Sequence, residues 1–151
     1  MLSEMLTPEE ARRLYETAFS VQVPGLEIVT GDPIASQMRR QQSEDLGNTP
    51  VGGCAAGVSG LTLLPDGTIT PCRRLPIPVG NVRSDRLREV WATSDVLARL
   101  RNRNLYSSSC GRCPRWAECR GCRAIAYAYA QLQGHDDYLG PDPQCFVENR
   151  V

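Results

Sequence analysis

Seven cysteines are the residues of this chain whose type and spacing could do chemistry. Four of them fall within thirteen residues, in the order C-x2-C-x5-C-x2-C: Cys110, Cys113, Cys119 and Cys122. The other three stand apart: Cys54, Cys72 and Cys145. A C-x2-C step lets two sulfurs bind one metal centre, because the short turn between them keeps the backbone clear of it. The two steps predict two half-sites, which the outlying cysteines can complete.

Metal ligation is favoured over disulfide bonding. Seven is an odd number for a disulfide framework. The N-terminus lacks the basic start and apolar run of a signal peptide, so we expect the chain in the cytoplasm, where thiols stay reduced. No stretch is long enough to span a membrane, so we expect no membrane association. The formal net charge of zero gives no indication of a nucleic-acid partner.

Seven thiolates suit iron–sulfur clusters better than zinc. Two closed zinc sites need eight ligands, and one site needs only four. His135 could be the eighth, but it lies in a polar loop where a single histidine is usually solvated. Two [4Fe–4S] clusters can use seven cysteines, because one iron of a cubane can stay open to water, substrate or another ligand. Iron–sulfur is therefore the first interpretation and structural zinc the alternative.

The first fifty residues are expected to form an arm without chemistry of its own. The stretch from Thr7 to Glu10 predicts a capped helix start, and the helix should run to about Phe19 with Leu14 and Ala18 facing inward. Residues 26–30 resemble a short strand. Polar residues 36–49 then form a linker or a partly helical arm.

From residue 51 onward the pattern predicts a small, loop-rich α+β domain. Residues 60–72 should form a β-hairpin in which Gly67 takes a positive φ, and this brings Cys72 back towards Cys54. Two short helices should follow, the first capped by Ser84 or Asp85 and the second starting at Ser94–Asp95. Gly and Pro number 13 and 11, so the core is modest and plausibly depends on bound metal.

A further helix is expected over residues 124–130, directly after the four-cysteine stretch. Cys122, Ile125 and Tyr129 share one helical face there, so Cys122 should be buried at the helix start. Trp116, between the two C-x2-C steps, is predicted to shield the site from water. Six arginines lie close to cysteines in sequence: Arg73, Arg74, Arg112, Arg115, Arg120 and Arg123. Most are interpreted as solvated surface residues, with offsetting of cluster charge or carboxylate binding as the alternative.

The cysteine order resembles the SPASM domain, the C-terminal auxiliary-cluster module of many radical SAM enzymes. The order C-x12-G-x4-C formed by Cys54, Gly67 and Cys72 is followed by the four-cysteine stretch and then by Cys145. The sequence around the cysteines also resembles SPASM domains over about residues 51–147, especially those of the heme-synthesis-like branch. The segments that carry this resemblance are Leu63-Leu-Pro-Asp-Gly67, Val79-Gly-Asn-Val82, Glu89-Val-Trp91, Cys119-Arg-Gly-Cys-Arg-Ala124 and Asp142-Pro-Gln-Cys145. The general pattern has three residues between the last two clustered cysteines, whereas this chain has two.

The resemblance implies two interleaved [4Fe–4S] clusters. One complete cluster would be held by four cysteines: Cys110, Cys113, Cys119 and Cys145. A second would be held by three: Cys54, Cys72 and Cys122. Relatives with full ligation carry a further cysteine shortly before the equivalent of Cys54, and this chain has none there. The fourth position of the second cluster is therefore expected to be open or filled by a group other than cysteine.

The resemblance also implies what this chain lacks. The C-x3-C-x2-C spacing that radical SAM enzymes use to bind SAM does not occur in it. We therefore expect residues 1–50 to be an arm, a possible remnant of the end of a radical SAM partial barrel, and residues 51–151 to be a SPASM-like iron–sulfur domain. Such a domain, which would be the non-catalytic part of a radical SAM enzyme, passes electrons or anchors a substrate in peptide or tetrapyrrole modification. Its partners would be a radical SAM core and a ferredoxin or flavodoxin. The alternatives are a structural zinc-binding interaction module and a small ferredoxin-like electron carrier.

Overall fold

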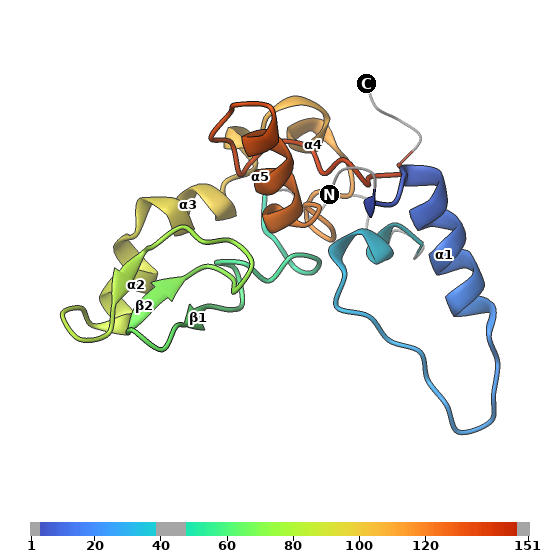
Figure 1. Ribbon diagram of the computed structural model, residues 1–151, viewed down its shortest axis with the longest axis horizontal. Helices are drawn as coiled ribbons and strands as arrows, with labels where there is room; N and C mark the ends of the chain where they lie inside the picture. The colour runs from blue at the N-terminus through green and yellow to red at the C-terminus, as the bar shows by residue number, and fades with distance from the viewer. Residues whose placement is uncertain (1–3, 39–47, 148–151) are drawn as a thin grey trace.

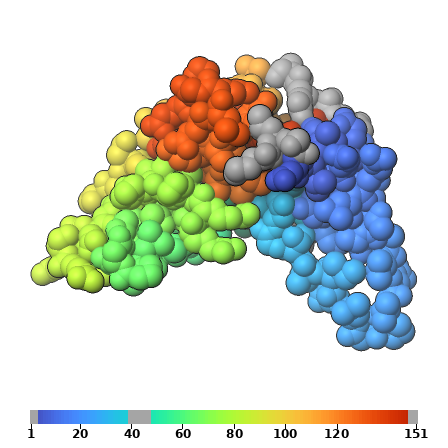
Figure 2. Space-filling model, viewed as in Figure 1, coloured from blue at the N-terminus to red at the C-terminus, as the bar shows by residue number. Residues whose placement is uncertain are grey.

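The computed structural model describes residues 4–38 and 48–147. Its helices and strands are short. In chain order they are α1 (Pro8–Ser20), the 3-10 helix η2 (Pro33–Met38), β1 (Thr62–Leu63), β2 (Thr68–Thr70), β3 (Gly80–Asn81), α2 (Leu87–Thr93), α3 (Asp95–Arg101), the 3-10 helix η3 (Arg103–Leu105), α4 (Ser108–Arg112) and α5 (Arg123–Leu132). The sheet with α2 and α3 lies at one end of the molecule and α1 at the other, with α4 and α5 between them (Figure 1). Figure 2 shows that the two ends project on either side of a hollow. This small α+β architecture agrees with the predicted fold class.

The predicted capped helix is confirmed as α1. The Thr7 hydroxyl accepts from the Glu10 N–H, and the Glu10 carboxylate accepts from the Thr7 N–H, which together form a capping box. The prediction that Leu14 and Ala18 face inward is wrong, because Leu14 is 51% exposed and Ala18 is only half-buried. The buried residues are Ala11 and Tyr15. The inward face is set by η2, against which α1 packs.

The predicted strand at residues 26–30 is also wrong. Leu26 and Val29 are exposed, and Leu26 forms only an isolated bridge with Val23. A strand needs a neighbour to take up its backbone hydrogen bonds, and this segment pairs with no other strand in the described chain. Of the predicted polar linker, residues 36–38 end η2, while residues 39–47 lie outside the described part.

The predicted β-hairpin is confirmed. β1 and β2 pair antiparallel, with Thr62 opposite Thr70. The turn closes through the Gly67 N–H, which donates to the Leu64 carbonyl at 2.9 Å, and Gly67 has a φ of +90°. A third strand, β3, pairs antiparallel with β2 and was not foreseen.

The two short helices after the sheet are confirmed as α2 and α3. Ser94 caps α3 by accepting from the Leu97 N–H, as expected. The prediction that Ser84 or Asp85 caps α2 is wrong, because α2 begins one residue later, after Arg86, which makes no side-chain cap. Asp85 instead accepts a hydrogen bond from the Asn81 N–H at 2.7 Å and ties the helix to β3.

The main hydrophobic core lies between α3, α5 and the four-cysteine stretch. Trp116 is 1% exposed and meets the Tyr106 ring edge-on at a centroid distance of 5.4 Å. The Tyr106 hydroxyl donates to the Leu100 carbonyl at 2.8 Å. Three cysteines belong to this core: Cys54, Cys110 and Cys122. A smaller core joins α1 and η2 to Cys119, so the N-terminal arm packs directly against the cysteine-rich segment.

The start of α5 agrees with prediction in one respect and differs in another. Cys122 is buried at the N-cap of α5, as expected. Ile125 and Tyr129, which were predicted to share its buried face, are only half-buried. The fully buried side of α5 is rotated towards Arg123, Ala124 and Ala126. No helix within residues 4–38 or 48–147 has the length and apolar character that a membrane crossing requires.

Candidate metal centre

The four-cysteine stretch is arranged by short turns. Cys110 lies in the five-residue helix α4, and Cys113 is the residue at which that helix ends. Gly111, between them, packs closely against the chain before α4. An added Cβ there would come within 2.4 Å of the Tyr106 carbonyl oxygen. All seven cysteines carry free thiols. They are buried or half-buried.

Four of the predicted ligands are close neighbours: Cys110, Cys113, Cys119 and Cys145. Burial raises the pKa of the Cys110, Cys113 and Cys145 thiols, and charge on the other members of the set raises each of them further. Two of the thiols, those of Cys119 and Cys145, share one hydrogen-bond donor at 3.5 Å from each sulfur. The structure therefore brings residues 26 positions apart in sequence to one place.

The remaining three cysteines are Cys54, Cys72 and Cys122. Burial raises the pKa of the Cys122 thiol, and a charge on Cys54 raises it further, so these two sulfurs are neighbours. Cys72 is half-buried and packs against the core that contains them both. No direct contact between the sulfur of Cys72 and either of the other two is described among these residues.

Within the described residues, no three or more His, Cys, Asp or Glu side chains form a group that could hold one metal ion. Zinc requires sulfurs about 2.3 Å from one centre. In a four-iron cluster each cysteine binds a different iron, so the ligand sulfurs lie farther apart. His135, the candidate eighth zinc ligand, is exposed.

Hydrogen-bond donors point at several sulfurs. The backbone N–H of Gly121 donates to Cys119 Sγ at 3.3 Å, and Arg74 Nη2 lies 3.9 Å from Cys122 Sγ. Gln37, in η2, supplies the donor shared by Cys119 and Cys145. N–H donors stabilise sulfur that carries negative charge, as it does in a bound cluster.

Arg123 is the clearest sign that the site fits an anionic group. It is 0% exposed, and its Nη1 donates to the carbonyls of Tyr138 and Gly140, the latter at 2.7 Å. Its Nε and Nη2 atoms have no hydrogen-bond partner among the described residues. Its positive charge opposes the rise in the pKa of Cys110, and it opposes the rise in the pKa of the buried Asp142 in the same way. A buried cation whose charge acts on a ligand thiol is suited to the net negative charge of a four-thiolate cluster.

The expectation that most of the six arginines are surface residues agrees with the structure, but two of the six are buried. Arg123 and Arg120 are 0% and 2% exposed. Arg115 is half-buried, and the other three are exposed: Arg73, Arg74 and Arg112. Sequence alone could not separate them, because all six have similar spacing to a cysteine.

Arg120 holds the segment that carries Cys54 against the four-cysteine stretch. Its guanidinium donates to the backbone carbonyls of Gly52, Cys54 and Ala117. Backbone bonds reinforce the contact, since the Cys54 N–H donates to the Cys119 carbonyl at 3.1 Å. Through these bonds, Cys54 is positioned by the chain around Cys119 rather than by its own neighbours.

Gly53 is required for this close approach, and its replacement should destabilise the site. It has a φ of +70°, and an added Cβ would come within 2.2 Å of the Cys119 carbonyl oxygen. We expect Gly53→Ala to lower the free energy of unfolding by roughly 2–4 kcal/mol, the sum of left-handed strain and overpacking. Denaturant unfolding followed by circular dichroism measures the change.

Gly134→Ala is the matched control for that substitution. Gly134 has a φ of +79°, but nothing lies within 4 Å of an added Cβ. It should show only the backbone strain of about 1–2 kcal/mol. Equal losses in the two variants would show that the contact with Cys119 does not limit stability.

Asp142 is a further buried polar residue of the site and was not singled out as functional from sequence. It is 2% exposed, and its carboxylate accepts from the N–H groups of Cys122 and Gln144 at 2.6 and 2.9 Å. Burial raises its pKa, while those N–H donors and Arg123 oppose the rise. Asp142 therefore fixes the backbone of one predicted ligand, Cys122, and stands beside the chain that leads to another, Cys145.

The sequence also gave no signal for Gln37. It was placed in a segment expected to carry no chemistry, yet its amide contacts sulfurs 82 and 108 residues away. Contacts at that separation leave no local spacing pattern.

Comparison with known proteins agrees with this site. Residues 54–123 match the family model SPASM, described as an iron-sulfur cluster-binding domain. The chain is 36% identical over 93 residues to an AdoMet-dependent heme synthase of Methanosarcina barkeri, covering 62% of this chain and 25% of that protein. It is 32% identical over 98 residues to one of Nitratidesulfovibrio vulgaris, covering 65% and 25%, and 29% identical over 98 residues to one of Oleidesulfovibrio alaskensis, covering 65% and 24%.

The chain spans about a quarter of the length of these curated relatives. No solved structure shows a significant match to it. The family match begins at Cys54, ends at Arg123 and includes six of the seven cysteines. Residues 54–123 are therefore similar to the SPASM family of iron–sulfur cluster-binding domains, as the order of the cysteines predicted.

Proposed function

We propose that this chain is an auxiliary domain that binds two [4Fe–4S] clusters in a radical SAM enzyme, either as part of a longer chain or as a separate subunit. The first cluster is held by Cys110, Cys113, Cys119 and Cys145. The second is held by Cys54, Cys72 and Cys122, and its fourth position is open or taken by a group other than cysteine. The observation that carries this proposal is the buried Arg123, whose positive charge acts on the Cys110 thiol in a region that matches an iron–sulfur family.

The clusters supply one-electron chemistry or a binding site for a substrate. The chain's own contribution is to bury the cysteines, to direct N–H donors at their sulfurs and to exclude water with Trp116, which is 1% exposed. Arg123 provides a positive charge inside the site. These features stabilise bound negative charge, which a reduced cluster carries in greater amount.

Cleavage of SAM belongs to a core domain or partner subunit, because this chain has no C-x3-C-x2-C loop. A ferredoxin or flavodoxin in the cytoplasm would supply electrons. Residues 1–50 then form the arm next to that core, and residues 51–151 form the cluster domain. Among substrates, the names of the matched relatives favour a tetrapyrrole over a peptide.

Anaerobic reconstitution with iron and sulfide, followed by metal analysis and EPR of the dithionite-reduced protein, tests the proposal. We expect about eight iron and eight sulfide per chain and two interacting [4Fe–4S]⁺ signals. Tight binding of one or two zinc ions without a cluster signal would contradict it and favour a structural zinc module. Cluster signals in a protein that transfers electrons without any radical SAM partner would favour a ferredoxin-like carrier.

A further inference from the structure

Gln37 bridges two predicted ligands of the first cluster. Its Nε2 lies 3.5 Å from the Sγ atoms of both Cys119 and Cys145. Its Oε1 accepts a hydrogen bond from the Phe146 N–H at 3.1 Å. That bond sets the orientation of the amide, because only the oxygen can accept from a backbone N–H. The nitrogen, with its two hydrogens, therefore faces both sulfurs and lies closer to them than the oxygen, which accepts from the Cys145 thiol at 3.9 Å.

Gln37 comes from outside the matched domain, which begins at Cys54. It is held in place by the packing of η2 on α1. The Tyr15 hydroxyl of α1 donates to Asp32 at 2.7 Å, and Asp32 in turn accepts from the Ile34 N–H at the start of η2. Ile34 is 1% exposed and shares a core with Cys119. The position of the amide is thus built by the N-terminal arm.

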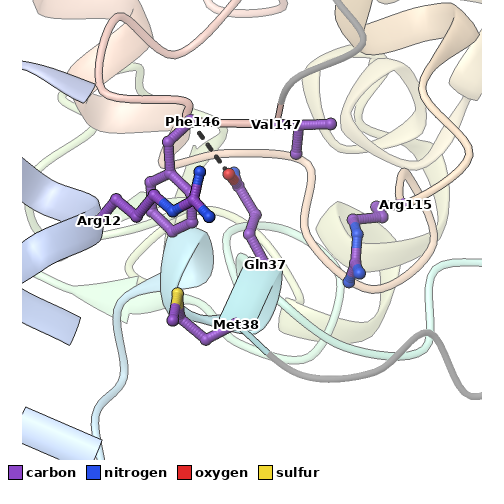
Figure 3. Close-up of a pocket in the computed structure, with 6 residues that line it drawn as sticks. All are labelled: Arg12, Gln37, Met38, Arg115, Phe146 and Val147. Carbon is purple, nitrogen blue, oxygen red and sulfur yellow. Dashed lines mark hydrogen bonds between the residues drawn. The ribbon is translucent and has the colours of Figure 1, made fainter. Parts of the chain in front are cut away.

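Gln37 also lines a pocket of about 360 Å³. Six residues line it: Arg12, Gln37, Met38, Arg115, Phe146 and Val147. Figure 3 shows Gln37 between Arg12 and Arg115, with its hydrogen bond to Phe146. The side chain that contacts the sulfurs of Cys119 and Cys145 therefore also lines this pocket.

We propose that Gln37 is a positioning residue for the first cluster, and that its N–H donors raise the reduction potential by stabilising negative charge on two ligand sulfurs. Hydrogen bonds to sulfur and solvent exposure both tune cluster potentials. The added electron makes the sulfurs more negative, so a donor stabilises the reduced form more than the oxidised form. This inference rests on the proposed cluster site, and it assigns to the arm a role in redox tuning.

Two variants of the full chain separate this role from a merely structural one. Gln37→Leu removes the donor and the bond to Phe146. Gln37→Glu keeps an oxygen that can accept from the Phe146 N–H, but removes the donor and adds negative charge. Gln131→Leu, at an exposed position of α5, is the control. The measurement is an EPR-monitored redox titration of the reconstituted proteins, with iron content determined alongside.

Both Gln37 variants should shift the midpoint of one cluster to more negative potential, with Gln37→Glu shifting further. At the wild-type midpoint, the ratio of reduced to oxidised first cluster should fall several-fold, while Gln131→Leu stays unchanged. A wild-type midpoint in Gln37→Glu would overturn the inference. If Gln37→Glu fails to assemble its clusters, a wild-type midpoint in Gln37→Leu would overturn it instead. Absence of clusters from the wild-type chain would instead contradict the proposed function, so the two failures are distinct.

Discussion

Cys145→Ser should abolish one of the two cluster signals and leave the other, while Cys54→Ser should do the reverse. A serine hydroxyl is a poor replacement for the soft thiolate that iron in a cluster prefers. Cys145 lies near the thiols of Cys110, Cys113 and Cys119, whereas Cys54 lies near that of Cys122. Each substitution should reduce the iron content from about eight to about four per chain. EPR and iron analysis after reconstitution measure both effects.

Cys72→Ser supplies the internal control for this pair. If Cys72 belongs with Cys54 and Cys122, its replacement should remove the same signal as Cys54→Ser. Circular dichroism of each variant separates loss of a cluster from loss of the fold. Loss of the same signal in Cys145→Ser and Cys54→Ser, with the fold retained, would contradict the two-set assignment.

Arg123→Met should weaken cluster retention beyond its effect on the metal-free fold. Without the cluster, the substitution already removes two carbonyl hydrogen bonds and the positive charge that acts on the buried Asp142 carboxylate, so we expect the metal-free fold to lose stability as well. With the cluster present, the same substitution removes a buried positive charge that faces bound negative charge. We expect iron to be lost to a chelator roughly ten- to a hundredfold faster, equivalent to about 1.4–2.8 kcal/mol.

The matched control for that substitution is Arg73→Met. Arg73 is next to Cys72 in sequence but exposed, so screening by water should make its charge nearly irrelevant. Chelation kinetics of the loaded proteins and thermal unfolding of the metal-free proteins give the two comparisons. Equal destabilisation by Arg123→Met in the loaded and metal-free states would assign Arg123 to the fold alone.

Local sequence signals predicted several elements well. The capping box at Thr7, the hairpin turn at Gly67 and the Ser94 cap each depend on residues within a few positions of one another. Such interactions are complete within the segment that encodes them, so neighbouring residues suffice to identify them.

Predictions that depended on a distant partner did less well. The stretch at residues 26–30 has strand-like composition, but nothing in the described chain pairs with it. Leu14 was expected to face inward on its hydropathy, yet η2 contacts the side of α1 that carries Ala11 and Tyr15. Which face of a helix is buried depends on what packs against it, and that partner is separated from α1 by a loop.

By itself, the sequence determined that the chain carries two C-x2-C steps with three outlying cysteines, a hairpin and several short helices. It also carried the likeness to SPASM domains, which the family match confirms. Only the tertiary structure decided which polar residues face the thiols. Arg123 is buried while Arg73 is exposed, and Gln37 reaches Cys119 from 82 residues away. The reason is physical: ligand types and their spacing are written along the chain, whereas burial and charge around them arise from packing between distant segments.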